Sequence, residues 1–465
     1  MFFYVRNHLL VFRVIPILFF SLLFLTHRSA SQQTVFIPAA DDLAVLQTLT
    51  EKFEMIYKKE TSKLPAQNRM EMKEMYRLRH DNIKAKFDKK EINTSPIATA
   101  YLQKIVQEIV NGNEILKNQD ISCYFSKSGV PNASYLGEGM IIFNMGLFER
   151  LENESQAAFI LCHELAHYYL HHSENSIRKY VTTMNSHEVQ KELRNIKRSQ
   201  FNKRTELEKL MKNLTFDSRH HTRDHESQAD SMAVELLRNT GFDVGESLST
   251  LALLDLIDTD SLNTEECLKK TFDAPGFRFQ KKWLTKETGL LGGHAEIKDE
   301  ALLSDSLKTH PDCGTRIKYI APLAMKYKSP RRQKFLVNKD TFHELKWLFQ
   351  YEIIEYAFIS GNYTRSLFYT LGLLDKKPAD PYLVTQTGKI FNGFYAAQKK
   401  HTLRKLIDLP SPEFPSNYNI LLQFIQNLYL EDYASISYHY LNKFQSAKSY
   451  APYVTAYQNS IQLAK

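Results

Sequence analysis

Hydrophobic and polar positions repeat with a helical period over most of the chain. Charged and apolar residues alternate at helical spacing over residues 42–59 and 69–90, which predicts two surface helices. The run Asn93-Thr-Ser-Pro96 is a start signal for a third helix. One face of that helix carries Ile97, Tyr101, Ile105 and Ile109.

Two short segments, 121–126 and 140–144, instead have the composition of strands and are separated by turns containing Gly and Pro. The pattern is helical again from Asn153 through His172, and a charged, helix-favouring stretch covers 176–214. A further helix is predicted over 226–238, with Gly241 as its stop. The pattern therefore predicts an α+β fold that is mostly α-helical and has one small sheet.

The character of the chain changes beyond Ser329-Pro330, where Tyr, Phe and Leu recur at helical spacing. Gly361-Asn-Tyr363 is echoed by Glu431-Asp-Tyr433, at about twice the period of 34 residues that marks tetratricopeptide repeats. Two interpretations stay open, a tetratricopeptide-like array and an irregular helical domain. The predicted division is a helical segment over 32–95, a central domain over 96–328 and an all-α domain over 329–465.

The N-terminus has the features of a signal peptide. Arg6 and Arg13 precede the apolar run 14–26, which is shorter than the roughly 20 residues of a membrane span. Ser29 and Ser31 are small residues placed for a cut before Gln32. We expect residues 1–31 to be removed and the protein to be periplasmic or secreted, without an integral membrane span. The alternative is an uncleaved signal that anchors the protein to a membrane.

Composition narrows the classes of function. A hydrophobic fraction of 43% is sufficient for folded cores, and a net charge of +8 is spread over many Lys and Glu residues. Such a balance is typical of a solvated surface, so we expect no nucleic-acid partner. The four cysteines lack the C-x-x-C spacing of metal sites. Cys162 is predicted to be a buried free thiol, whereas the pairing of Cys123, Cys267 and Cys313 stays open.

The helix predicted from Asn153 carries the sequence His163-Glu-Leu-Ala-His167. Residues four apart lie on the same face of a helix, so two imidazoles at this spacing can bind one zinc ion. Glu164 is rotated by about 100° from His163, which lets its carboxylate reach water on the metal without being a ligand. The flanking Ala and Leu residues provide the helix with a side to bury.

A catalytic zinc site needs a third protein ligand and one open position. Glu226 supplies that ligand on a second helix, and we expect one Zn²⁺ per chain. Asp230 follows one turn later and is placed to hydrogen-bond the outer nitrogen of a ligand histidine. The remaining histidines near the two helices are interpreted as exposed or capping side chains: His171, His172, His220, His221 and His225.

Three signatures occur in order: His163-Glu-x-x-His167, Glu226-x-x-x-Asp230 and His310-Pro-x-x-x-x-Arg316-Ile. Together with the run from Asn132 to Leu147 they resemble the HtpX and CAAX-prenyl-endopeptidase family of zinc metalloproteases, which are gluzincins. The resemblance covers about residues 97–323, and its exported, soluble, BepA-like branch also has a helical-repeat tail. This chain lacks the several membrane spans of the HtpX branch, so prenylated substrates are not expected.

The resemblance implies that His163, His167 and Glu226 bind zinc and that Glu164 is the general base and acid. His310 is expected to donate a hydrogen bond to the oxyanion of the attacked carbonyl, since a fourth ligand would close the metal site. Arg316 is expected to orient that segment. An extended substrate is expected to pair with a strand, whose alternative interpretation is an ordinary core strand: Met140, Ile141, Ile142, Phe143 and Asn144.

These observations predict a zinc-dependent endopeptidase that hydrolyses peptide bonds of exported, unfolded or misassembled proteins. The expected partners are protein or peptide substrates, together with envelope proteins bound by the C-terminal helical domain. The alternative is a chaperone-like scaffold, in which that domain binds envelope proteins while proteolysis is latent.

Overall fold

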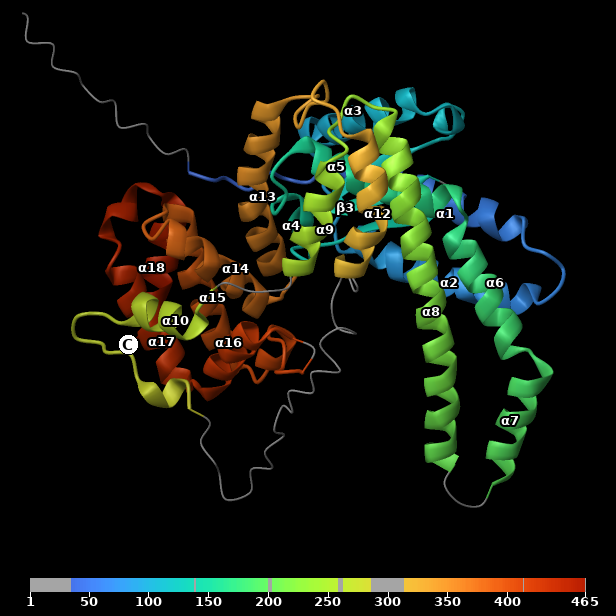
Figure 1. Ribbon diagram of the computed structural model, residues 1–465. Coiled ribbons are helices and arrows are strands. Elements are labelled where there is room, and N and C mark those ends of the chain that lie inside the picture. Colours follow the sequence, from blue (N-terminus) through green and yellow to red (C-terminus); the bar gives the residue numbers. More distant parts are fainter. Residues whose placement is uncertain are drawn as a thin grey trace, which may run out of the picture. The chain divides into compact units, whose positions relative to one another are not determined.

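The computed structural model describes residues 35–464, apart from residues 138, 200–202, 258–261, 286–312 and 413, and apart from the side chains of 208, 209 and 211–222. Helices make up most of these residues and accompany a single three-stranded sheet, so the predicted mostly helical α+β fold is confirmed (Figure 1). Within the described ranges, no helix has both the length and the apolar character needed to cross a bilayer. The predicted signal peptide, 1–31, lies outside them.

The sheet consists of β1 (Ser122–Ser126), β2 (Ala133–Gly137) and β3 (Met140–Asn144) in the order β1-β3-β2. β1 runs parallel to β3, and β2 runs antiparallel to it. β1 and β3 correspond to the two predicted strands. β2 was missed because its sequence, Ala-Ser-Tyr-Leu-Gly, contains few of the branched apolar residues that mark strands.

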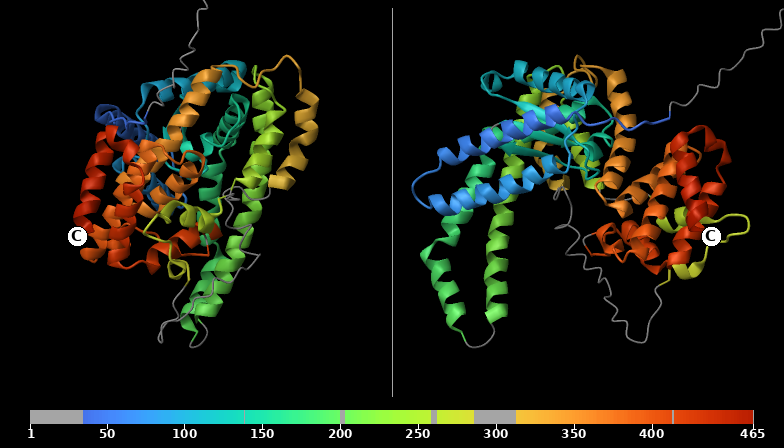
Figure 2. Two further views of the ribbon diagram at one scale, coloured as in Figure 1. Left: turned by 90° about the vertical axis from the view of Figure 1, so that its left-hand side faces the viewer. Right: turned by 180° about the vertical axis from the view of Figure 1, so that it is seen from behind.

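Successive side chains of a strand point to opposite faces of the sheet. In β3, the central strand, the side chains on both faces are buried. Met140 and Ile142 pack against α1 (Leu43–Ser62) and α2 (Arg69–Asp88), and Ile141 and Phe143 join the core under α3 (Pro96–Gly112) and α5 (Glu154–Tyr169). Figure 2 shows α1 and α2, in blue, running along one side of the sheet. This double burial explains the uninterrupted apolar sequence of β3.

The position of β3 corrects the predicted substrate strand. A peptide can add only to a strand that has a free edge, and β3 is bonded to β1 on one side and to β2 on the other. Those five residues therefore form an ordinary core strand: Met140, Ile141, Ile142, Phe143 and Asn144. The edge beside α5 belongs to β2.

A long helix organises the segment that follows the catalytic helix. α8 (Lys203–Arg238) continues without a break through the two stretches that the sequence pattern separated. α6 (His172–Met184) and α7 (His187–Arg198) precede it, and α7 runs beside the first half of α8 (Figure 1). The second half of α8 packs on α5. α9 (Glu246–Leu256) packs on α5, and α12 (Cys313–Tyr327) packs on α8 and α9.

The C-terminal third is all helical, as predicted, and the tetratricopeptide-like alternative stays a prediction. Its helices are α13 (Lys339–Ile359), α14 (Tyr363–Lys376), α15 (Pro381–Lys399), α16 (Ser416–Asn427), α17 (Leu430–Asn442) and α18 (Ala451–Leu463). Four short helices, α4 (Met145–Phe148), η1 (Glu114–Leu116), η3 (Leu403–Lys405) and η4 (Gln445–Ser449), lie in connections.

The core of this tail also includes residues from the central segment. α10 (Thr264–Phe272) buries Phe272 against the rings of Phe391, Phe424 and Tyr440. In η2 (Lys281–Trp283), Trp283 is fully buried. The side-chain amide of Asn427 donates to the Trp283 carbonyl at 3.1 Å. Residues on both sides of the predicted boundary at 328 therefore build one hydrophobic core.

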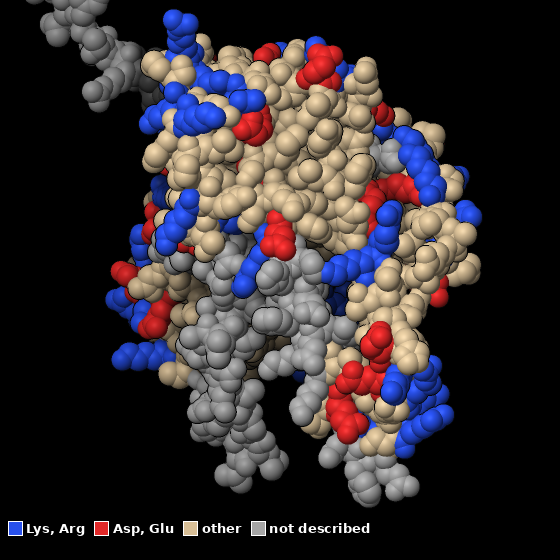
Figure 3. All heavy atoms as spheres, turned by 45° about the vertical axis from the view of Figure 1, so that its right-hand side comes forward, with Lys and Arg blue, Asp and Glu red and all other residues tan. Residues whose placement is uncertain are grey.

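All four cysteines are buried and none forms a disulfide, which confirms the buried thiol predicted for Cys162. On the surface, basic and acidic side chains are interspersed over the face drawn in Figure 3, as expected of a solvated surface.

Candidate active site

Helix α5 positions the candidate catalytic residues and is built from local signals. The Asn153 side chain caps the helix by accepting from the Gln156 N–H at 3.1 Å. Every residue from Glu154 to Cys162 is buried, so the first two and a half turns are enclosed by the protein. His163, Glu164 and His167 follow directly and are only partly buried. The end of a rigid helix thus carries polar side chains to the wall of a cleft.

Three potential ligand atoms converge at this end of α5. The Nε2 atoms of His163 and His167 are 3.0 Å apart; Glu226 Oε2 lies 3.5 Å from His163 Nε2, and the other carboxylate oxygen, Oε1, lies 3.4 Å from His167 Nε2. Ligands bound tetrahedrally at ~2.0–2.1 Å are separated by about 3.3 Å, the edge of that tetrahedron. Two imidazoles and a carboxylate are also the donor set that zinc prefers. The residues present therefore fit a zinc ion in both spacing and chemistry.

The outer nitrogen of His163 is held by a carboxylate that is itself ion-paired. Its Nδ1 lies 2.9 Å from Asp230 Oδ1, and the fully buried Asp230 accepts two hydrogen bonds from Arg316, at 2.7 and 2.8 Å. Arg316 also lies 3.2 Å from Glu226. A carboxylate at Nδ1 keeps the hydrogen on that atom, so in the neutral ring the Nε2 lone pair faces Glu226 and His167.

The charges of this cluster favour a cation at its centre. Burial opposes a charge on His163, but its hydrogen bonds to Asp230 and Glu226 outweigh burial and raise the pKa of His163 to about 10. Burial likewise opposes ionisation of Glu226, yet His163 and His167 hold the pKa of Glu226 well below its usual range. Positive charge is thus stabilised where the three ligand atoms meet.

Glu164 faces the cleft beside the ligands and is held by the edge strand. Its carboxylate accepts a hydrogen bond from the Tyr135 backbone N–H of β2 at 2.8 Å. The cleft has a volume of about 460 Å³ and is bordered by β2, α5, α6 and α8. Its apolar lining consists of Leu147, Phe159, Ile160 and Leu254, together with Ala133. The carboxylate, the ligand atoms and a free strand edge therefore share one cavity.

His172, interpreted from the sequence as exposed or capping, belongs to the site. It is buried, and its Nδ1 lies 3.0 Å from His167 Nδ1. Its Nε2 lies 3.1 Å from Gln228 Oε1 on α8. No spacing rule could reveal this contact, because α5 ends at Tyr169 and His172 begins α6 in a new direction. His225 stacks on the ring of His172, at 4.1 Å between centroids.

Comparison with known proteins identifies the domain. Residues 96–324 match the model of peptidase family M48. These residues form a peptidase family M48 domain. The resemblance drawn from the sequence is confirmed at the level of the family, and the M48 protein is accordingly a metalloendopeptidase. No curated protein matches the chain. The match begins with α3 and ends in α12, so α1, α2 and the helices from α13 onward lie beyond it.

The fold of the M48 domain brings together most of the residues singled out in the sequence. His163, Glu164, His167, Glu226, Asp230 and Arg316 surround one point of the cleft. Arg316 forms ion pairs with the carboxylates of Asp230 and Glu226. His310 and Pro311 lie outside the described residues, so the oxyanion role of His310 stays a prediction. The side chains of His220 and His221 are likewise outside the description.

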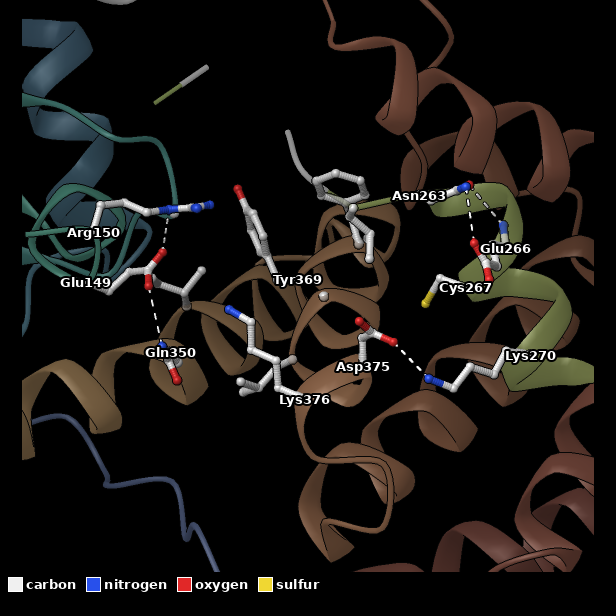
Figure 4. A pocket seen from close by; sticks show the side chains of 16 residues that line it. Glu149, Arg150, Asn263, Glu266, Cys267, Lys270, Gln350, Tyr369, Asp375 and Lys376 are labelled. Carbon is white, nitrogen blue, oxygen red and sulfur yellow. Dashed lines mark hydrogen bonds and ion pairs between the residues drawn. The ribbon is translucent and has the colours of Figure 1, made fainter. Parts of the chain in front are cut away.

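A second cavity of the M48 protein, about 410 Å³, is lined by Gly129 in the loop after β1, by Glu149 and Arg150 directly after α4, and by residues of α10, α13 and α14 (Figure 4). Several of its charged side chains are satisfied by one another. Lys270 contacts Asp375 at 3.0 Å, and Glu149 contacts Arg150 at 2.7 Å. Among the described residues, only His163, His167 and Glu226 form a group able to hold a metal ion. The catalytic chemistry is therefore assigned to the cleft beside α5.

Proposed function

We propose that this M48 peptidase is a zinc-dependent endopeptidase that cleaves exported proteins in unfolded or misassembled form. The observation that carries the proposal is the convergence of the His163, His167 and Glu226 ligand atoms, at 3.0 to 3.5 Å from one another, beside the Glu164 carboxylate. The exported, unfolded nature of the substrate rests on the predicted signal peptide and on the sequence resemblance.

Zinc bound at these three ligands would lower the pKa of a water molecule and polarise the substrate carbonyl. The protein supplies the proton transfers. Glu164, as general base, accepts the proton of the attacking water and later delivers it to the amine that leaves. The Tyr135 N–H holds this carboxylate in the cleft, so Glu164 is pre-oriented for both transfers.

The edge of β2 is the surface that we propose for the substrate backbone. Residues of an antiparallel strand direct their backbone groups alternately to its two sides. The Tyr135 N–H points away from β3 toward Glu164, so the backbone groups of Ala133 lie on the same side. An extended peptide added there would run past Glu164. This mode recognises backbone rather than side chains, which suits unfolded substrates.

The test is cleavage of casein or a model peptide by the purified protein, with and without a chelator. Glu164→Gln should lower kcat by about 10²–10⁴-fold while zinc content is retained. Glu152→Gln, an exposed glutamate just before the same helix, is the matched control and should have normal turnover. Normal turnover of Glu164→Gln, or full activity in chelator, would refute the proposal.

The scaffold alternative needs a test that leaves the fold intact. Deleting the tail from residue 330 would expose Phe272 and Trp283, whose aromatic partners include Phe424. The cleaner comparison uses Glu164→Gln in the full chain and asks whether this variant rescues the phenotype of cells that lack the protein. Failure to rescue supports proteolysis, and rescue without turnover supports the scaffold.

A further inference from the structure

We infer that His172 is a positioning residue, which together with Gln228 fixes the tautomer of His167 and holds its Nε2 toward the metal. The inference rests on the zinc site of the proposed function and adds two residues to it. Neither was assigned a role from the sequence motifs.

The polarity of this relay follows from its last acceptor. Gln228 Oε1 can only accept, so His172 Nε2, 3.1 Å away, is the donor. A neutral imidazole with a hydrogen on Nε2 has a lone pair on Nδ1, which accepts from His167 Nδ1 at 3.0 Å. His167 Nε2 is then left with its lone pair, and it faces His163 and Glu226. Each hydrogen is accounted for.

The position of His172 excludes two simpler roles. His172 contacts the Nδ1 atom of His167, whereas the Nε2 atom of His167 faces Glu226. His172 therefore lies behind the ligand ring and is not a further metal ligand. It is also more than a packed aromatic side chain, because both of its ring nitrogens are engaged and it is only 4% exposed. The ring of His225 covers it, with 9° between the two planes.

The two ligand histidines are therefore oriented by partners of different charge. Asp230, paired with Arg316, holds His163, whereas the neutral His172 and Gln228 hold His167. Gln228 and Asp230 both lie on α8, two and four residues after Glu226 along the chain. One helix thus supplies a ligand and supports for the outer nitrogens of both other ligands, and α6 enters the site through His172.

The experiment measures zinc affinity by competition with a chelator of known affinity, so the result does not depend on turnover. Removing a hydrogen-bond partner of a ligand histidine typically costs 10–100-fold in metal affinity. His172→Ala should show such a loss. His172→Asn should recover most of it, because its side-chain oxygen lies close to the position of Nδ1 and can accept from His167. The visible spectrum of the cobalt-substituted protein should change in His172→Ala.

The matched control is His171→Asn, which removes the adjacent imidazole and suits the left-handed backbone at that position, where φ is 54°. It should bind zinc as the wild type does. Equal zinc affinity in His172→Ala and wild type overturns the inference alone. A loss that His172→Asn does not relieve also overturns it, since the hydrogen bond is then not the cause. A wild-type protein without zinc affinity overturns the proposed function as well.

Discussion

The two ends of helix α5 carry polar groups that are satisfied in opposite ways. At the first turn, the fully buried Glu154 carboxylate accepts from the Tyr101 hydroxyl at 2.8 Å. It also accepts from the backbone N–H groups of Leu336, Val337 and Asn338, at 2.6 to 2.7 Å. At the other end, the Nε2 atoms of His163 and His167 and the Glu226 carboxylate converge, and this anion raises the pKa of His163 by favouring a positive charge beside it.

The difference separates a structural carboxylate from a functional one. Four donors saturate Glu154, which ties the catalytic helix to the segment entering α13 and has no capacity left for a ligand. The Glu226 carboxylate instead needs a positive charge where the two imidazoles meet it, which a proton on His163 or a metal ion can supply. Burial alone therefore does not identify a functional carboxylate. The distinguishing feature is whether neighbouring donors already fill its hydrogen-bonding capacity.

The largest expected loss of stability comes from removing the Glu154 carboxylate at the structural end of α5. Glu154→Ala leaves three backbone N–H groups and a hydroxyl buried without their acceptor, so unfolding should become easier by about 3–5 kcal/mol. Chemical denaturation would measure this change, and the folded fraction should retain normal zinc affinity. Glu152→Ala, exposed two residues earlier, should change stability by less than ~0.5 kcal/mol. A small effect of Glu154→Ala would mean that the four hydrogen bonds do not anchor the helix.

Removing the Arg316 guanidinium, which neutralises Asp230, should lower both the stability of the protein and its affinity for zinc. Arg316→Ala leaves a fully buried carboxylate without its partner, which should cost roughly 3 kcal/mol of stability. Because Asp230 also orients His163, zinc affinity should fall by about 10–100-fold. Lys318→Ala, exposed on the same helix, should change neither quantity. Normal zinc binding in Arg316→Ala would show that Asp230 holds His163 without help.

A third buried carboxylate, on α13, sharpens the comparison through pH. Burial, with smaller contributions from Asp41 and Glu355, outweighs Lys127 and raises the pKa of Glu352 from 4.5 to about 7. Between these values the folded state binds the extra proton, so stability should fall as pH rises from about 4.5 to 7. Glu352→Gln should remove this slope and stabilise the protein at pH 8 by on the order of 2–3 kcal/mol.

Melting temperatures measured from pH 4.5 to 8 would test this prediction, with the exposed Glu344→Gln on the same helix as the control. A wild-type protein whose excess stability over Glu352→Gln grows with pH would contradict it.

The smallest expected effect concerns the helix cap. Asn153→Ala removes the bond to the Gln156 N–H and the donor to Glu246, 2.9 Å away, and should cost about 1 kcal/mol. Denaturation midpoints would measure the cost. Since the cap lies at the structural end, zinc affinity should not change, and a clear loss of affinity would show that the two ends of α5 are coupled.

Local sequence determined those features of the M48 protein that depend on neighbours along the chain. The spacing of His163 and His167 follows from helix geometry, as does the separate direction of Glu164. The apolar run of β3 marked a strand correctly, and the ordered motifs indicated the family. These properties were predictable because helix and strand periods act over a few residues.

Only the tertiary structure decided which side chains satisfy one another. His172 contacts Gln228 across 56 residues, and Glu154 contacts Asn338 across 184, although neither pair shares a periodic pattern. The sequence also assigned the substrate edge to β3, because burial on both faces and pairing on both edges cannot be told apart from an apolar run. The physical reason is that such contacts depend on the path of the chain through space, which no local period encodes.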